Sequence, residues 1–175
     1  MLVAVVSDTH GQTQNVIRIL QRYSLDALFF LGDFYADGEE IQQALPGEVP
    51  LFGVAGNGDL FLEPSQKTET EVFLGGKHFF LTHGHTYQVK KSVERVAFVG
   101  EKLHADAVLF GHTHIPFLAQ NARGMWILNP GSASFPRGID GPTFALIEWE
   151  ERQPLHFLML EVSDGQVLYS SDDLS

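Results

Sequence analysis

Short apolar runs of strand length alternate with amphipathic segments through the first two-thirds of the chain. The first run, Leu2 to Val6, is continuous and rich in β-branched residues, as expected of a strand that is buried on both faces. In the next segment, Val16, Ile17 and Leu20 fall on one side of a helix that Thr13 can cap. This pattern predicts strands that alternate with helices, which is typical of a parallel sheet.

Further apolar runs extend the pattern to the end of the chain. The other expected strands are Ala27 to Leu31, Leu51 to Val54, Glu71 to Leu74, Lys77 to Thr82, Ala107 to Phe110, Met125 to Leu128, Thr143 to Trp149, Leu155 to Val162 and Val167 to Tyr169. Two more helices are expected, from Glu39 to Leu45 and through Val89 to Leu103. Gly75-Gly76 predicts a hairpin. We therefore predict one α/β domain over residues 1–175, with a parallel part followed by antiparallel strands.

Composition and charge narrow the classes of function. The chain has 175 residues, and its lack of cysteine excludes disulfides, thiolate metal sites and cysteine nucleophiles. Its net charge of −11 disfavours an extended surface for nucleic acid or for an anionic membrane. No apolar run approaches the roughly 20 residues of a membrane span, and the N-terminus is typical of a strand rather than a signal peptide. We expect a cytoplasmic protein, and the sequence leaves open whether it forms a homo-oligomer.

Polar residues with neighbouring glycines follow five of the predicted strands. The motifs are Ser7-Asp8-Thr9-His10-Gly11, Gly32-Asp33, Gly56-Asn57-Gly58-Asp59, Thr82-His83-Gly84-His85 and Gly111-His112-Thr113-His114. The carboxyl ends of the strands in an open α/β sheet share one edge, and ligands bind in the crevice there. We therefore expect the five motifs to converge.

Together the motifs offer imidazole, carboxylate and amide ligands for metal ions. The candidate ligands are Asp8, His10, Asp33, Asn57, His83, His112 and His114. They are too many for one zinc site with an open position, where about three protein ligands are usual, and they suit two ions that share a carboxylate. Asp33, which stands alone on its loop, is the natural bridge. The mixture of imidazole and oxygen favours Mn, Fe, Co, Ni or Zn over Ca or Mg.

In this order, the five motifs resemble the signature of the calcineurin-like metallophosphoesterases. The compact size and the later Asn129-Pro130-Gly131-Ser132 are similar to the small phosphodiesterases of the YfcE type, a branch that also contains the eukaryotic retromer sorting subunit. The resemblance extends from Val5 to about Arg137. It implies a four-layer αββα sandwich of two mixed β-sheets flanked by helices.

The resemblance also implies a division of the ligands and a chemistry. One divalent ion would be held by Asp8, His10, Asp33 and His114, and a second by Asp33, Asn57, His83 and His112. The family attacks phosphate esters with a metal-activated hydroxide, so Asp33 and Asn57 are expected to be catalytic through the water and phosphate that the metals position. We expect manganese, with Ni, Fe, Co or Zn as alternatives, and a small phosphoester as substrate.

One position departs from the family pattern. Where the third motif usually carries His, or Cys in many small members, this chain has Gly58, so the usual proton donor to the leaving group is missing. His85 or a metal-bound water are the substitutes that we consider. General-acid assistance contributes about 10²–10⁴-fold and matters least for a stable leaving group. We therefore predict that diesters with good leaving groups are preferred to simple monoesters.

Residues around the motifs have both functional and structural interpretations. Asp59 is expected either to hydrogen-bond a ligand histidine or only to shape its turn. Asn129 and Ser132 are more typical of a turn than of a phosphate contact, and Arg137 is a weak candidate for contact with the phosphate.

A different class of function is a protein-interaction scaffold that keeps the fold and has lost catalysis. Phe34-Tyr35 and Leu60-Phe61-Leu62 follow two of the motifs, where exposed aromatic residues would serve a partner, line a substrate pocket or cap the core. Against the scaffold, every ligand position is filled by a coordinating residue. Another dinuclear hydrolase, such as an amidohydrolase, fits the ligand types but not their order.

Overall fold

The chain forms two mixed β-sheets, and the computed structural model describes residues 1–59, 66–138 and 141–174. The strands are β1 (Leu2–Val6), β2 (Ala27–Phe30), β3 (Leu51–Gly53), β4 (Glu69–Leu74), β5 (Lys77–Thr82), β6 (Ala107–Phe110), β7 (Pro116–Gln120), β8 (Trp126–Pro130), β9 (Thr143–Glu148), β10 (His156–Glu161) and β11 (Val167–Ser170). The helices are α1 (Gln14–Leu20), α2 (Tyr35–Ala44) and α3 (Glu94–Leu103), with 3₁₀ turns at His85–Tyr87 and Ser171–Leu174. None of these helices is long and apolar enough to cross a membrane.

The two sheets combine parallel and antiparallel pairing. The first has the order β11-β10-β9-β1-β2-β3, in which β1, β2 and β3 are parallel and β9, β10 and β11 are added antiparallel. The second has the order β4-β5-β6-β8-β7, with β5, β6 and β8 parallel and antiparallel strands at both edges. Both parts of the predicted pattern, parallel and antiparallel, are therefore present.

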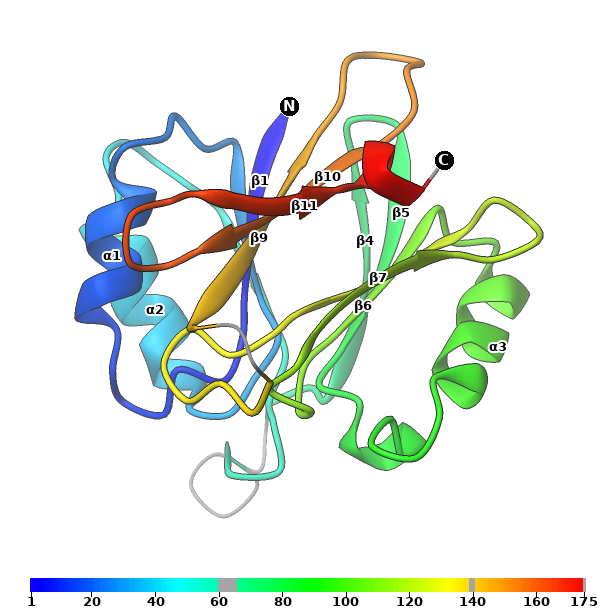
Figure 1. Cartoon of the computed structure of the whole chain (residues 1–175), viewed down its shortest axis with the longest axis horizontal. Helices are drawn as coiled ribbons and strands as arrows, with labels where there is room; N and C mark the ends of the chain where they lie inside the picture. Colours follow the sequence, from blue (N-terminus) through cyan, green and yellow to red (C-terminus); the bar gives the residue numbers. More distant parts are fainter. Residues whose placement is uncertain (60–65, 139–140, 175) are drawn as a thin grey trace.

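Three apolar clusters hold the layers together. The cluster between the sheets includes the fully buried Phe29, Phe79 and Phe157, and the rings of Phe29 and Phe79 lie 5.2 Å apart. A second cluster packs α1 and α2 on the first sheet, and a third packs α3 on the second. In Figure 1 the helices lie on the two outer sides of the paired sheets. The predicted four-layer αββα sandwich is thus confirmed, while its extent as one domain over residues 1–175 stays a prediction.

Three elements differ from the sequence expectation. Helix α2 begins at Tyr35 and not at Glu39, so it includes Gly38, which packs directly on Phe30, where an added Cβ would lie 2.8 Å from the ring. Helix α3 begins at Glu94, after the separate 3₁₀ turn. Strand β7 was not expected, since Pro116 opens it and proline marks the first residue or the edge of a sheet.

The motif-bearing ends of the strands meet across the two sheets, and not along one sheet edge as the sequence alone suggested. The motifs after β1, β2 and β3 come from the first sheet, and those after β5 and β6 come from the second. A hydrogen bond from main chain to side chain joins the two sets: the amide nitrogen of His112 donates to Asp8 Oδ2 at 2.9 Å. The sandwich therefore brings loops of both sheets to one end.

Candidate metal centre

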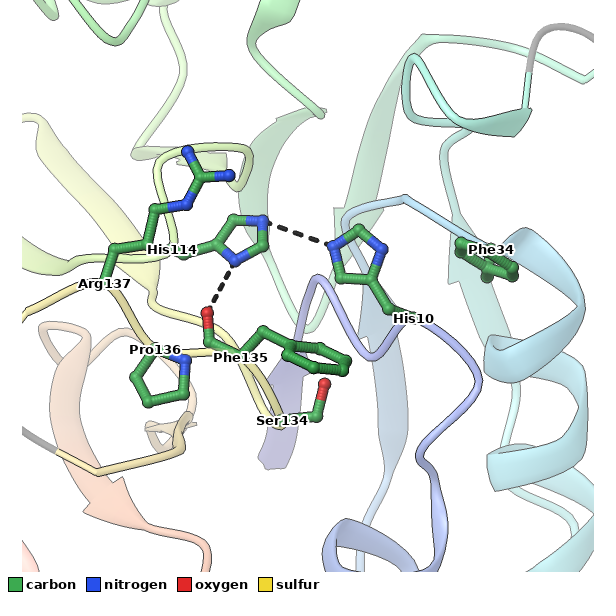
Figure 2. A pocket seen from close by; sticks show the side chains of 7 residues that line it. All are labelled: His10, Phe34, His114, Ser134, Phe135, Pro136 and Arg137. Atoms are coloured by element: carbon green, nitrogen blue, oxygen red, sulfur yellow. Dashed lines mark hydrogen bonds between the residues drawn. The ribbon is translucent and has the colours of Figure 1, made fainter.

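The first group of converging side chains is drawn from both sheets. One ligand atom from each of Asp8, His10, Asp33 and His114 lies within 4.8 Å of the others. Asp8 Oδ1 is 3.1 Å from His114 Nε2, which is 3.3 Å from His10 Nε2. His10 Nε2 is in turn 3.8 Å from Asp33 Oδ2. Four potential ligand atoms thus gather at one place, and Figure 2 shows the two imidazoles facing one another.

The second group shares Asp33 with the first. The ligand atoms of Asp33, His83 and His112 also lie within 4.8 Å of one another. His83 Nε2 is 3.4 Å from Asp33 Oδ1 and 3.2 Å from His112 Nδ1. Asp33 therefore turns Oδ2 toward His10 and Oδ1 toward His83, an arrangement that suits a carboxylate between two cations.

Main-chain carbonyls orient two of the imidazoles. His83 Nδ1 lies 2.7 Å from the carbonyl oxygen of Leu31, and His114 Nδ1 lies 2.7 Å from that of Phe135. Because a carbonyl oxygen can only accept, Nδ1 is the protonated donor in both rings. Each Nε2 is then directed into its group, as in imidazoles that bind metal ions.

The loops that carry these side chains have unusual backbone conformations. Nine non-glycine residues of the described chain have positive φ. Five of them are candidate ligands, namely Asp8, His10, Asp33, His112 and His114. Such conformations cost on the order of 1–3 kcal/mol each and cluster at functional sites. Glycines allow the loops to approach: a Cβ at Gly56 would overlap Asp33 Oδ1, and one at Gly111 would overlap Ser7 Oγ.

The electrostatics of the two groups fit divalent cations. Asp8 Oδ1 is buried and, although His114 Nε2 is 3.1 Å away, it accepts no hydrogen bond within the described residues. Burial by itself would raise the pKa of Asp8, but His114 and His83 together hold it below the ordinary value. Burial lowers the pKa of His112 to about 4, and His83 adds to the effect. At neutral pH the site offers an ionised carboxylate and a neutral imidazole, the forms that bind metals.

Asp59 corrects one expectation. In the described residues its carboxylate binds main-chain amides and not a ligand histidine: Oδ1 accepts from Tyr35 N and Oδ2 from Gly56 N, both at 2.7 Å. A short acidic side chain competes well for the free amides of a turn. Asp59 thereby ties the loop after β2 to the loop after β3.

Asn57 and His85 lie at the edge of the second group. Asn57 is exposed beside Gly58, whose amide nitrogen donates to Asp33 Oδ1 at 2.9 Å. The His85 ring is 5.4 Å from the His83 ring, and His85 Nδ1 is buried with no hydrogen-bond partner in the described chain. Burial and the nearby His83 lower the pKa of His85. The roles of Asn57 as a ligand and of His85 as a proton donor stay predictions.

The segment from Asn129 to Ser132 holds the loop after β6 and the loop after β1 in place. The sequence had indicated only a simple turn there. Asn129 is buried, and its Nδ2 donates to the carbonyl oxygen of Gly111 at 2.8 Å and to Thr113 Oγ1 at 2.9 Å. Ser132 Oγ donates to the carbonyl oxygen of Asp8 at 2.7 Å. The signal available in the sequence was the position of this segment at the end of a strand.

Asp37 is a second residue that the sequence reasoning missed. It is buried in the first turn of α2, and its Oδ2 accepts from the Thr9 hydroxyl at 2.7 Å and from the amide nitrogen of Gly11 at 2.6 Å. Asp37 thus fixes the loop that carries Asp8 and His10. A helix expected only from Glu39 left this carboxylate outside any element.

Comparison with protein families decides the classification. Residues 1–152 match the calcineurin-like phosphoesterase superfamily domain. The chain belongs to this superfamily. It is 30% identical over 152 residues to the probable metallophosphoesterase YsnB of Bacillus subtilis (strain 168), covering 86% of this chain and 85% of that protein. It is 26% identical over 171 residues to the phosphodiesterase YfcE of Escherichia coli (strain K12), covering 85% and 88%.

Solved structures carry the same fold. Wild-type Vps29 from Entamoeba histolytica, solved in complex with Zn²⁺, superimposes with a TM-score of 0.77 at 23% identity, covering 98% of this chain and 97% of that one. This likeness shows the fold. The family match and these relatives confirm the resemblance drawn from the five motifs, and the candidate ligand groups agree with the divalent metal ions that the superfamily implies.

Proposed function

We propose that this protein is a dinuclear, metal-dependent phosphodiesterase that hydrolyses a small phosphodiester. The observation that carries the proposal is the Asp33 carboxylate, whose two oxygens face two separate ligand groups. One site is assigned to Asp8, His10, Asp33 and His114, and the other to Asp33, Asn57, His83 and His112. Manganese is the ion that we propose, and the names of YsnB and YfcE support phosphoester chemistry.

Two bound divalent ions would supply Lewis-acid chemistry, which polarises phosphoryl oxygens and lowers the pKa of water toward neutrality. The chain itself keeps the ligand atoms in place: Leu31 and Phe135 fix two imidazoles through their carbonyl oxygens, and the amide of Gly58 holds Asp33 Oδ1. Such preorganisation means that little rearrangement is needed when charge develops on the phosphate.

The preference for a good leaving group follows from Gly58. The backbone of this residue reaches Asp33, but without a side chain it offers no proton donor to the departing oxygen. His85 is the alternative side chain that we consider, with its ring 6.1 Å from that of His112. A lowered pKa leaves His85 mostly neutral at pH 7, which weakens it as an acid.

Net acidity does not oppose a phosphate substrate at this site. Two divalent ions would bring +4 against the −2 of Asp8 and Asp33, so the local charge at the site is positive although the chain carries −11. Acidic residues elsewhere disfavour long polyanions and leave a small phosphoester as the substrate. A cytoplasmic location, the absence of membrane and extended nucleic-acid partners, and the choice between monomer and homo-oligomer stay predictions.

The test is hydrolysis of bis(p-nitrophenyl) phosphate with added Mn²⁺, and with Ni²⁺, Co²⁺, Fe²⁺ and Zn²⁺ in parallel. We expect metal-dependent turnover that Asp33→Asn reduces by at least 100-fold. The exposed Asp164→Asn is the matched control and should retain full activity. Turnover that Asp33→Asn leaves unchanged would refute the bridging role.

The alternative function is a catalytically weak protein-interaction scaffold. Exposure of Phe34 and Phe135 beside the first ligand group favours it, whereas Leu60, Phe61 and Leu62 lie outside the described residues. Absence of hydrolysis with every metal, in protein shown to bind two ions, would support the scaffold and exclude the enzyme.

A further inference from the structure

A cavity of about 630 Å³ opens beside the first ligand group. It is lined by His10, Phe34, His114, Phe135 and Arg137, together with Ser134 and Pro136 (Figure 2). Sites for small organic molecules in proteins occupy about 300–1,000 Å³. The cavity therefore has room for an organic group in addition to a phosphate.

Two aromatic side chains dominate this cavity. Phe34 is 41% exposed and Phe135 is 45% exposed, although both are large apolar residues. Their rings meet the His10 ring from different loops, at centroid distances of 5.5 and 5.6 Å and nearly perpendicular to it. In Figure 2 they lie on either side of His10. Both rings thus adjoin a candidate ligand while keeping much of their own surface open.

Phe34 is held at this position in a strained backbone conformation. Its φ of 72° and ψ of 72° lie in the left-handed region, which a bulky side chain rarely adopts and which glycine or asparagine would occupy more cheaply. The next amide, Tyr35 N, is fixed by Asp59 Oδ1 at 2.7 Å, so the turn cannot easily relax. Strain of this kind is kept at ligand-binding positions.

Phe135 is fixed relative to the candidate centre as well. Its carbonyl oxygen holds His114 Nδ1 at 2.7 Å, and its amide donates to Ser132 Oγ at 2.8 Å. Arg137 extends from the same segment and lines the same cavity, and its amide nitrogen donates to the carbonyl oxygen of His114 at 3.0 Å (Figure 2). A cation and an aromatic ring therefore flank the ligand group together.

We propose that Phe34 and Phe135 bind a planar aromatic group of the substrate, a nucleobase of a nucleoside phosphoester, while its phosphate lies at the metal centre and Arg137 faces that phosphate. The proposal rests on the proposed function for the position of the phosphate. Aromatic side chains stack on bases regardless of sequence, and the exposed rings offer that surface within a cavity wide enough to admit a base. This assigns Phe34 and Phe135 as specificity-determining residues.

The test compares two probes that share a sugar phosphate and differ only in the base. Binding of adenosine 5′-monophosphate and of ribose 5-phosphate to the Mn²⁺-loaded protein is measured by calorimetry. We expect adenosine 5′-monophosphate to bind at least about fivefold more tightly, the lower end of the effect of stacking one base on an aromatic ring. Phe34→Leu and Phe135→Leu should each reduce that ratio, and the double variant should bring it close to one.

Three controls keep the result interpretable. Phe98→Leu removes a phenylalanine that is 60% exposed on α3, outside the lining of the cavity, and should leave the ratio unchanged. Phe135→Tyr keeps a ring and should restore the preference. Circular dichroism confirms that each variant is folded before its binding is compared.

The outcomes separate this proposal from the proposed function. Equal affinity of the wild type for both probes, or a preference that survives in the double variant, overturns the aromatic site even if bis(p-nitrophenyl) phosphate is hydrolysed. A base preference that the double variant loses supports the site even if no diester is hydrolysed, in which case only the catalytic proposal fails.

Discussion

Gly58 stands where the resemblance to the family led us to expect a proton donor. It occupies an exposed turn, its amide donates to Asp33 Oδ1, and a Cβ there would lie 3.2 Å from the same oxygen. A side chain therefore fits if the carboxylate shifts by a few tenths of an ångström. The position can receive the proton donor that it lacks.

Gly58→His is predicted to flatten the dependence of rate on the leaving group. A general acid accelerates poor leaving groups most, so hydrolysis of a phenyl ester should rise by about tenfold or more while that of a p-nitrophenyl ester changes little. Rates are measured over a series of aryl methyl phosphodiesters. Gly58→Ala carries the same Cβ without the imidazole and should retain the steep dependence. An identical slope in Gly58→His and the wild type would contradict the role given to this position.

His112 makes the metal-free protein sensitive to acid. Burial and the nearby His83 depress the pKa of its imidazole from 6.5 to about 4, so below pH 6.5 the unfolded chain takes up a proton more readily than the folded one. Acidification from about pH 6.5 to about pH 4 should therefore destabilise the wild type relative to His112→Asn. Urea unfolding in excess chelator at pH 7.0, 5.5 and 4.5 measures both chains. A difference in unfolding free energy that does not change with pH would argue against this environment.

At the scale of elements, the loops after the strands depend on buried side chains that are not ligands. Asn129 on β8 donates to the carbonyl of Gly111 and to Thr113 Oγ1, and its Oδ1 accepts from Gly131 N at 2.9 Å. The first two bonds hold the residues on either side of His112, and the third fixes the Asn129 side chain to its own turn. The strand thus positions ligands that lie elsewhere in the sequence.

Asn129→Ala is predicted to lower stability by about 2–4 kcal/mol, because it leaves several buried polar groups without partners. It should also weaken Mn²⁺ binding, since His112 and His114 lose the support of their loop. Asn121→Ala is the matched control: Asn121 caps the β7–β8 turn at the other end of the sheet, accepting from Met125 N at 3.0 Å. That variant should lose stability without losing metal affinity. Equal metal affinity in Asn129→Ala and the wild type would refute the positioning role.

Most of the elements could be predicted from local patterns, and the exceptions have physical causes. Leu2–Val6 and Ala107–Phe110 were correct because fully buried strands are continuous apolar runs. The first turn of helix α2 was missed because Gly38 is a poor helix former, whereas in the structure it lies in the helix and packs closely against Phe30. Strand β7 was not predicted because it begins with a proline and only one of its five residues is buried, so its sequence lacks the apolar run of a central strand.

The candidate ligands could be predicted from the sequence better than the residues that hold their loops in place. Asp8, His10, Asp33, His83, His112 and His114 meet as expected, because each follows a strand and carries a distinctive side chain. The supporting roles of Asp37, Asn129 and Ser132 could not be identified from spacing, since their partners are atoms of loops that lie far away in the sequence. For Asp59 the sequence left a histidine partner and a role in the turn equally open, because it shows the acid but not the amides from which the carboxylate accepts.

At the scale of the whole molecule, the sandwich joins two half-sites. The sheet of β1, β2 and β3 supplies Asp8, His10 and Asp33, while the sheet of β5 and β6 supplies His83, His112 and His114. The apolar layer between the sheets, with Phe29 against Phe79, keeps the two halves in register. Among the described residues, Asp33 is the candidate ligand that the two groups share, so the proposed pair of sites depends on it more than on any other residue.

The most direct test of this account is the number of Mn²⁺ ions bound per chain, measured by equilibrium dialysis of the chelator-treated protein. The wild type should bind two ions per chain, and Asp33→Asn should lose saturable binding at both sites, because its amide cannot supply an anionic oxygen to either. One ion in the wild type, or two ions bound with unchanged affinity by Asp33→Asn, would contradict a dinuclear centre bridged by Asp33.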